Sequence, residues 1–374
     1  MTTPQDPELP PDVDRAIRDL ASKLVERRLR EQGLAPGGAA LDATRPSLDP
    51  ASQAAPPDPD DPGLRAVLDI HDELQIDAEW TVWARRGFTW WAHRHAQRVW
   101  SEEGVDSFGQ VVYRVHVETD WGSGEAIVGR ERQAALAVLM GSVSLAGAIV
   151  TGDELRWRSH AVIHEENGAW LTKLLEIAAL AQATNVERGA DILESLELQP
   201  TTSVHPVNGA RDVPDEMLEA LEGLPLRDDR PPVDDAEIDE VVGVLEQAGA
   251  EVERRGDGLS TAMPQLVGDR AMTFDLSLGE RASVGAGVRM TLRLPSFPET
   301  LGVQEFPLDL NLMEVHGEPM AHLLGSWAAD LPDGSKPTPF FTCFVPNATL
   351  RPGVLLNLVL SMGTRAKWIE SRFG

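Results

Sequence analysis

Histidines and acidic residues alternate along one stretch of the chain, and a second stretch carries two more histidines. His116, Glu118 and Asp120 occupy every second position near the end of QVVYRVHVETDW, and His160 and His164 flank the apolar residues AVI. Imidazole nitrogens and carboxylate oxygens bind transition metals, and a histidine beside a carboxylate can act as a general acid or base. If the two stretches are neighbouring strands, then His116, Glu118, His160 and His164 are the candidate ligands of a metal-dependent enzyme.

A simpler interpretation is that these polar residues form the solvated faces of amphipathic strands, because polar residues alternating with valine are typical of half-exposed strands. The chain contains no G-x-x-x-x-G-K-[ST], H-E-x-x-H or G-x-S-x-G motif. Cys343 is the only cysteine, which excludes an internal disulfide and a cysteine-based metal cluster. The sequence therefore predicts a non-catalytic protein with no cofactor, and the metal-dependent enzyme is kept as an alternative.

Tryptophan is concentrated in the first half of the chain, where eight of the ten residues lie between Trp80 and Trp170. The stretch FTWWAHRHAQRVW, residues 88–100, has apolar residues at helical spacing and predicts a helix with Trp90 and Trp100 near the edges of its apolar stripe. Tryptophan is enriched in protein interfaces, where its large ring serves as an anchor. We therefore predict that Trp90, Trp100 and Trp121 bind a partner.

The charge balance limits which partners are plausible. The chain carries 60 acidic and 33 basic side chains, a formal net charge of -27, which repels phosphate and argues against nucleic acid. The same charge can attract a basic or extended protein segment. The N-terminus lacks the basic and apolar regions of a signal peptide, and the most apolar run, residues 134–150, consists largely of Ala, Gly and Ser. We therefore expect a cytoplasmic protein that binds a protein partner and no membrane.

Composition and periodicity divide the chain into four parts. Residues 1–62 predict an amphipathic helix, at 13–33, followed by a disordered tether rich in Pro and Asp. Residues 63–198 form the first predicted α+β domain. Residues 199–233 are acidic and Pro-rich and predict a linker, and residues 234–374 form a second α+β domain.

The two predicted domains end alike. SLAGAIV, LRWRSHAVIH and AWLTKLLEIAALA in the first half correspond to HLLGSWAAD, PFFTCFVPN and GVLLNLVLSMGTRA in the second. Leu171 and Leu175 can be aligned with Val354 and Leu358. The fold class predicted is α+β, with two tandem antiparallel-sheet domains, each with helices packed on one face, and an N-terminal tethered helix.

The order of elements, which is helix, three strands, helix, two strands and a long helix, resembles the type III secretion chaperone-like fold, including the YbjN-type bacterial domains. The resemblance is clearer over residues 234–373 than over 64–196, where the predicted helix at 88–100 interrupts a strand-to-strand passage. Members of that family are mostly non-catalytic binding proteins, and many pair as dimers that hold an extended segment of a partner. The resemblance thus implies a bacterial chaperone-like adaptor whose two domains form an intramolecular pseudo-dimer, or which forms a homodimer. A regulator that binds a small ligand between the domains is a further alternative.

Overall fold

The computed structural model describes residues 61–105, 109–123, 145–151, 154–195, 200–218, 235–256, 258–267, 269–281, 285–295, 306–316, 322–330 and 338–373. The N-terminal helix expected at residues 13–33 and its tether lie outside the described residues. Of the linker expected at 199–233, residues 200–218 are described.

The first half of the molecule is a six-stranded antiparallel sheet with helices on one face. Its elements are α3 (Pro62–Glu73), η1 (Ala78–Trp80), β1 (Thr81–Ala84), β2 (Gly87–Trp91), β3 (Ala96–Val105), β4 (Val111–Ser123), β5 (Gly147–Thr151), β6 (Glu154–Ile163) and α5 (Gly168–Ser195). The strands lie in the order β1-β2-β3-β4-β6-β5. Four consecutive strands thus form a meander, and β6 returns to pair with β4.

The second half has the same strand order. Its elements are α7 (Asp235–Gln247), β7 (Val252–Arg255), β8 (Gly258–Val267), β9 (Arg270–Arg281), β10 (Gly285–Arg293), α8 (Phe306–Val315), β11 (Ser326–Asp330), β12 (Thr338–Pro346), η2 (Asn347–Thr349) and α9 (Val354–Phe373). Reading from its other edge, the sheet runs β7-β8-β9-β10-β12-β11, and all pairs are antiparallel. The predicted α+β class with two antiparallel sheets is therefore confirmed.

The helix predicted at residues 88–100 is wrong, because this stretch forms β2, a bend and β3. Phe88 lies opposite Val99 in the β2–β3 pair, and Arg98 lies opposite Glu118 in the β3–β4 pair. Every residue of β2 is buried, so the strand lacks the alternation of a half-exposed strand. A strand buried on both faces reads as a continuous apolar run, which periodicity does not distinguish from a helix.

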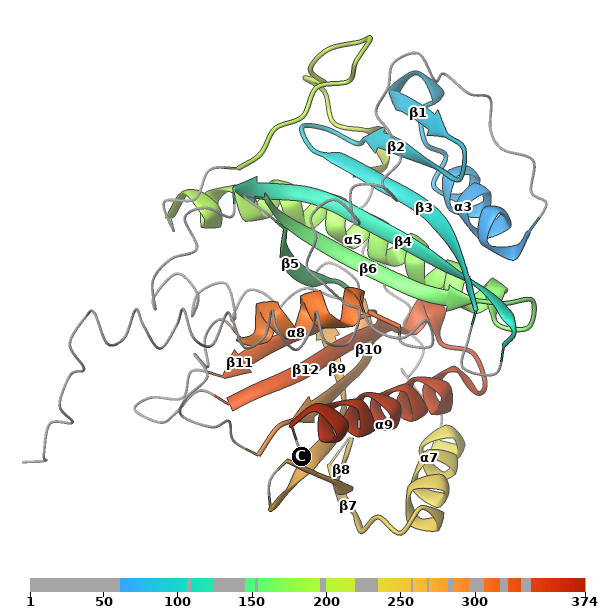
Figure 1. The fold of residues 1–374 in the computed structure, drawn as a ribbon, viewed down its shortest axis with the longest axis vertical. Coiled ribbons are helices and arrows are strands. Elements are labelled where there is room, and N and C mark those ends of the chain that lie inside the picture. The colour runs from blue at the N-terminus through green and yellow to red at the C-terminus, as the bar shows by residue number, and fades with distance from the viewer. Residues whose placement is uncertain are drawn as a thin grey trace, which may run out of the picture.

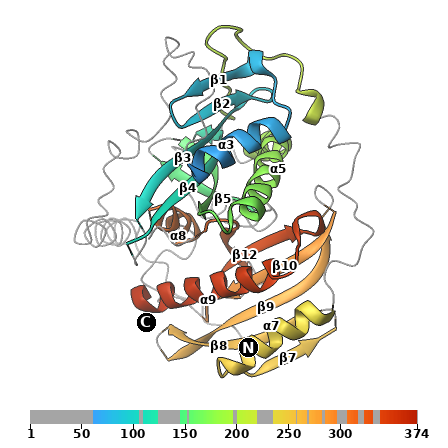
Figure 2. The same cartoon turned by 90° about the vertical axis from the view of Figure 1, so that its right-hand side faces the viewer.

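Helices cover one face of each sheet, as Figures 1 and 2 show. Helix α3 begins at Pro62, where the Asp61 side chain accepts a hydrogen bond from the Leu64 amide at 2.8 Å, as an N-cap should. It packs on β3 and β4, and α5 crosses β4 and β6, while α9 covers β8 and β10. No described helix combines the length and apolar character needed to cross a membrane.

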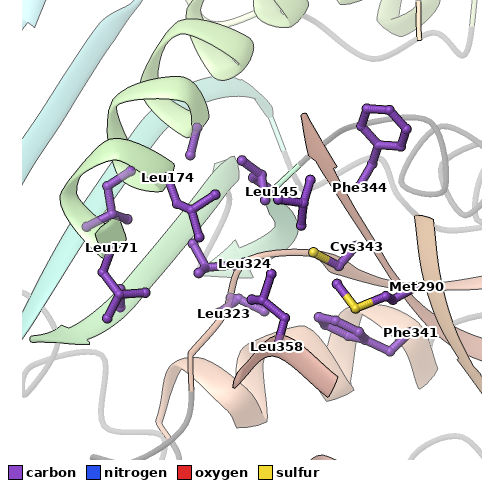
Figure 3. Packing of buried hydrophobic residues seen from close by; sticks show 14 of the residues in the cluster. Leu145, Leu171, Leu174, Met290, Leu323, Leu324, Phe341, Cys343, Phe344 and Leu358 are labelled. Atoms are coloured by element: carbon purple, nitrogen blue, oxygen red, sulfur yellow. The ribbon is translucent and has the colours of Figure 1, made fainter. Parts of the chain in front are cut away.

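The apolar interiors of the two halves are continuous. Leu171 and Leu174 of α5 belong to the same buried cluster as Leu323, Leu324 and Leu358 of the second half, as Figure 3 shows. Helix α8 lies between the sheets and contacts both β5 and β11 (Figure 1).

One side chain of α8 ties the two sheets together. The Asn311 amide donates to the carbonyl of Ala148 at 3.0 Å, and its oxygen accepts from the Trp327 amide at 2.8 Å. A Cβ at Gly147 would meet the Asn311 Oδ1 atom at 2.9 Å, so a side chain there would force the halves apart. The structure is thus two similar sheets that share one core.

Candidate functional site: the polar face of the first sheet and its strap

Strand alternation places the arginine, glutamate and histidine side chains at the centre of β3, β4 and β6 on the face of the first sheet that points away from α5. The register puts Trp100 of β3 opposite His116 of β4, and His116 opposite His160 of β6. The neighbouring row consists of Arg98, Glu118 and Arg158. The two stretches that carry the candidate metal ligands are therefore adjacent strands.

This polar face is buried, so the expectation of a solvated strand face is wrong. His116 and Glu118 are each 1% exposed, and His160 is 0% exposed. The end of α8 contributes to the cover, because Arg114 of β4 donates to the Val315 carbonyl at 3.2 Å. The second half therefore contributes to the burial of this face.

Ion pairs occupy the carboxylates of this face. Arg98 binds Asp120 through both guanidinium Nη atoms, at 2.7 Å each. Arg158 donates to Glu118 at 2.5 Å. Buried charges are tolerated when they are paired in this way, and a bidentate arginine–carboxylate pair is among the stronger arrangements. Glu118 is therefore an arginine partner in this fold.

His116 is held in one protonation state by its neighbours. Arg158, which can only donate, contacts the Nδ1 atom of His116 at 3.0 Å, so Nδ1 must accept and the proton of the neutral ring sits on Nε2. That Nε2 atom lies 3.4 Å from the Glu102 carboxylate, and the ring stacks on Trp100 with centroids 4.7 Å apart. Burial, followed by the charge of Arg158, lowers the pKa of His116 to about 3.

Glu102 stays ionised beside this histidine. Burial alone would raise the pKa of its carboxyl group, but the hydrogen bonds from His116 and Trp100 and the charge of Arg158 lower that pKa to about 2. The Trp100 indole donates to Glu102 at 3.2 Å, and the Arg158 guanidinium lies 4.4 Å from the Trp100 ring centroid. Glu102, neutral His116 and Arg158 thus hold one another in place through hydrogen bonds and charge.

The four candidate metal ligands are only partly brought together. His116 and His160 are neighbours, with ring centroids 5.5 Å apart. Glu118 lies in the next row with Arg158, and His164 is exposed beyond the end of β6. Within the described part of the chain, no three His, Cys, Asp or Glu side chains are placed to hold a metal ion.

The three tryptophans predicted to bind a partner are placed in the interior. Trp90 is 0% exposed, Trp121 is 1% exposed and Trp100 is 2% exposed. Trp121 stacks on Trp157 with ring centroids 4.7 Å apart. These rings are closed to solvent in the described structure, and their binding of a partner stays a prediction.

The sequence reasoning missed a segment that folds back on the first half. We name residues 200–218 the strap. Its backbone amides at Thr201, Ser203 and Asp215 donate to carbonyls of the first half, at 3.1, 2.8 and 2.8 Å respectively. The strap is the yellow-green loop that passes over β2 at the end of the molecule remote from the second half (Figures 1 and 2).

Arg211 is the principal side-chain anchor of the strap. It donates to the Trp91 carbonyl at 2.8 Å and to the Asp77 carboxylate at 2.6 Å, and its guanidinium lies 5.1 Å from the Trp80 ring centroid. His205 packs edge-on against Trp91, whose indole donates to the Ser203 hydroxyl at 2.9 Å. The described part of the expected linker is therefore packed against β2 and its surroundings through its polar groups.

The sequence did contain one signal for this segment. HPVNGA, residues 205–210, includes an Asn-Gly pair typical of tight turns, and His205 and Gly209 exchange both backbone hydrogen bonds, at 2.8 and 2.9 Å. The composition of the segment predicted a linker instead, because linkers are often rich in Pro and acidic residues.

Comparisons of the chain with protein-family models, with curated proteins and with solved structures gave no match.

Proposed function

We propose that the protein is a non-catalytic, chaperone-like adaptor of the bacterial cytoplasm that binds a protein partner through the outer surface of the strap. The main support for this proposal is that the strap exposes apolar side chains although hydrogen bonds hold its backbone to the first half. Val204 and Val207 are each 63% exposed and Val213 is 68% exposed. All three valines belong to the strap, and several exposed apolar side chains on one ordered segment are typical of sites of protein interaction.

The charges around the strap favour a partner segment with basic residues. Glu79, Asp212 and Glu216 are exposed on or beside the strap, and the whole chain is strongly acidic. An extended segment that alternates aliphatic and basic side chains would bury the valines and meet these carboxylates. Opposite charge of this kind speeds encounter and selects the partner more than it adds affinity.

The buried polar face supports the non-catalytic part of the proposal. Its most reactive combination is His116 with Glu102, in which Arg158 lies against the imidazole Nδ1 atom and His116 is 1% exposed. A general base must reach the proton that it abstracts from the substrate. In the described arrangement, the candidate base faces an arginine and a carboxylate of its own sheet.

Site-specific photo-crosslinking tests the strap surface. A photoreactive amino acid at position 207 should give a covalent adduct of defined mass in the native cells, and the adduct should diminish at least about tenfold when Val204 and Val213 are replaced by serine. The matched control is position 360 on α9, where Leu360 is likewise exposed, at 51%, but lies in the other half. Equal adducts at both positions, or none at 207, would reject the strap as the binding surface.

A further inference from the structure

The two halves are joined by backbone hydrogen bonds at the part of β6 that does not pair with β5. Strand β5 pairs with Glu154–Arg158 of β6 and ends there, so the edge of β6 beyond Arg158 has no β5 neighbour. There His160 and Leu323 exchange backbone hydrogen bonds, at 3.0 and 2.9 Å. A piece of the second half thus extends the first sheet at this point, and we name these contacts, with those of His322 and Arg114, the joint.

A histidine side chain takes part in the joint as an acceptor. The Val162 amide donates to the Nδ1 atom of His322 at 3.0 Å. A backbone N–H can only donate, so His322 must lack a proton on Nδ1 for this bond to exist. Protonation of that nitrogen would leave two donors facing each other, and the hydrogen bond between the halves would be lost.

Four more histidines surround the joint, together with arginines. The charged and titratable groups facing it are Arg114 and His116 from β4, Arg158 and His160 from β6, His164 after β6, Glu102 from β3, Glu314 and His316 from α8 and its end, and Arg365 from α9.

The acids in this group already have partners. Arg365 binds both oxygens of Glu314, at 2.6 and 2.7 Å, and also donates to the His322 carbonyl at 2.7 Å. Glu102 faces His116 and Trp100. Added protons would therefore place new positive charge beside arginines whose carboxylates are committed.

We infer that the joint is an acid-sensitive device, held closed by neutral His322, His160, His316 and His116 and opened when they gain protons. The proposal concerns the relation between the halves and does not depend on the strap as a binding surface. Opening would uncover the polar face of the first sheet, which is otherwise closed to solvent.

The electrostatics agree with the direction of this effect. Burial, then the charges of Arg365 and His164, lower the pKa of His322 to about 4. Burial and the charge of Arg114 bring the pKa of His160 well below its ordinary value, and burial and Arg158 lower that of His316. A histidine whose pKa is lower in the closed state stabilises that state fully above about pH 6.5, and this stabilisation falls as the pH drops toward the closed-state pKa.

Hydrogen exchange on the full chain tests the proposal at pH 6.5 and 5.5, where carboxyl groups of ordinary pKa stay ionised. The joint amides of His160, Val162 and Leu323 should open about fivefold more often at the lower pH for each histidine that gains a proton, after correction for intrinsic exchange rates. Amides of the β9–β10 ladder, such as those around Met290, serve as internal reference and should keep their protection. Unchanged joint amides, or equal losses in joint and ladder, would overturn the proposal.

A substitution identifies the histidine that senses the proton. In His322→Asn the amide oxygen can replace Nδ1 as acceptor for Val162 but cannot gain a proton, so the acid-driven opening between pH 6.5 and 5.5 should fall about fivefold. His205→Asn is the matched control, because the Nδ1 atom of His205 also accepts backbone amide hydrogen bonds but lies in the strap, and the joint amides of this variant should respond to acid as in the wild type. An undiminished acid response in His322→Asn contradicts the role of His322, and if that variant fails to fold, the wild-type comparison of joint and ladder amides still decides the proposal.

Discussion

At the scale of single residues, Arg158 links three side chains of the buried polar face. It donates to Glu118 and to His116 and lies over the Trp100 ring. Each of these neighbours is buried, so each would lose a compensating contact if the guanidinium were removed. The cost of an unpaired buried charge exceeds the worth of the pair itself.

We predict that Arg158→Ala lowers the free energy of unfolding by about 3–5 kcal/mol, as is usual when one partner of a buried ion pair is removed. Chemical denaturation followed by tryptophan fluorescence measures the change. Arg254→Ala is the control, because Arg254 forms an ion pair with Asp239 at the surface, and exposed pairs contribute below about 1 kcal/mol. An equal decrease in the free energy of unfolding in the two variants would contradict the predicted role of Arg158 in stabilising the buried face.

At the scale of elements, the strap depends on a few anchors. Three of its backbone amides bind the first half, and Arg211 joins it to Trp91 and Asp77. Few apolar side chains of the strap are buried, since its valines point outward and Leu218 alone joins the main cluster as a fully buried residue. Such a segment should open locally without unfolding the sheets.

We therefore predict that Arg211→Ala raises the rate of thermolysin cleavage within residues 203–213 by at least about tenfold, which corresponds to a loss of roughly 1.4 kcal/mol in local stability. Thermolysin cuts before aliphatic residues, so removal of the arginine does not remove a cleavage site. Asp212→Ala alters an exposed neighbour and should leave the rate unchanged. Faster cleavage throughout the chain would instead indicate global destabilisation.

At the scale of the whole molecule, the halves share their interior. The main cluster takes residues from α5 and from α9, and a second cluster joins Trp121 and Trp157 of the first half to Leu308 and Ala328 of the second. Separation would expose this apolar surface at about 25 cal/mol for each Å². Neither half is therefore expected to reach its native packing alone.

We predict that residues 1–226 and 227–374, expressed separately, are aggregated or lack near-ultraviolet circular dichroism, and that co-expression restores a one-to-one complex with the native spectrum. Size-exclusion chromatography with light scattering measures the assembly. A Gly147→Val change in the co-expressed pair should weaken the complex, because a Cβ there meets Asn311 and the Gly325 carbonyl. Two separately folded monomers would contradict the shared core.

The sequence by itself determined the fold class and the duplication. Alternation of valine with polar residues predicted β4, the long apolar periodicity predicted α5, and Cys343 lies buried in the predicted strand β12. These patterns are local, because side-chain direction within one strand or helix repeats with a fixed period. Periodicity also predicted that His116, Glu118 and Asp120 share a face.

Only the tertiary structure decided what covers that face and what the tryptophans contact. The alternation in β4 has the same form whether water or the second half lies over it, so burial of His116 could not be inferred from spacing. Residues 88–100 form strands because β2 pairs with β1 and β3, and β3 pairs in turn with β4. The strap is ordered because Arg211 meets Asp77 and Trp91. Such contacts join residues far apart in the chain, and single-sequence patterns carry no information on which distant groups will meet.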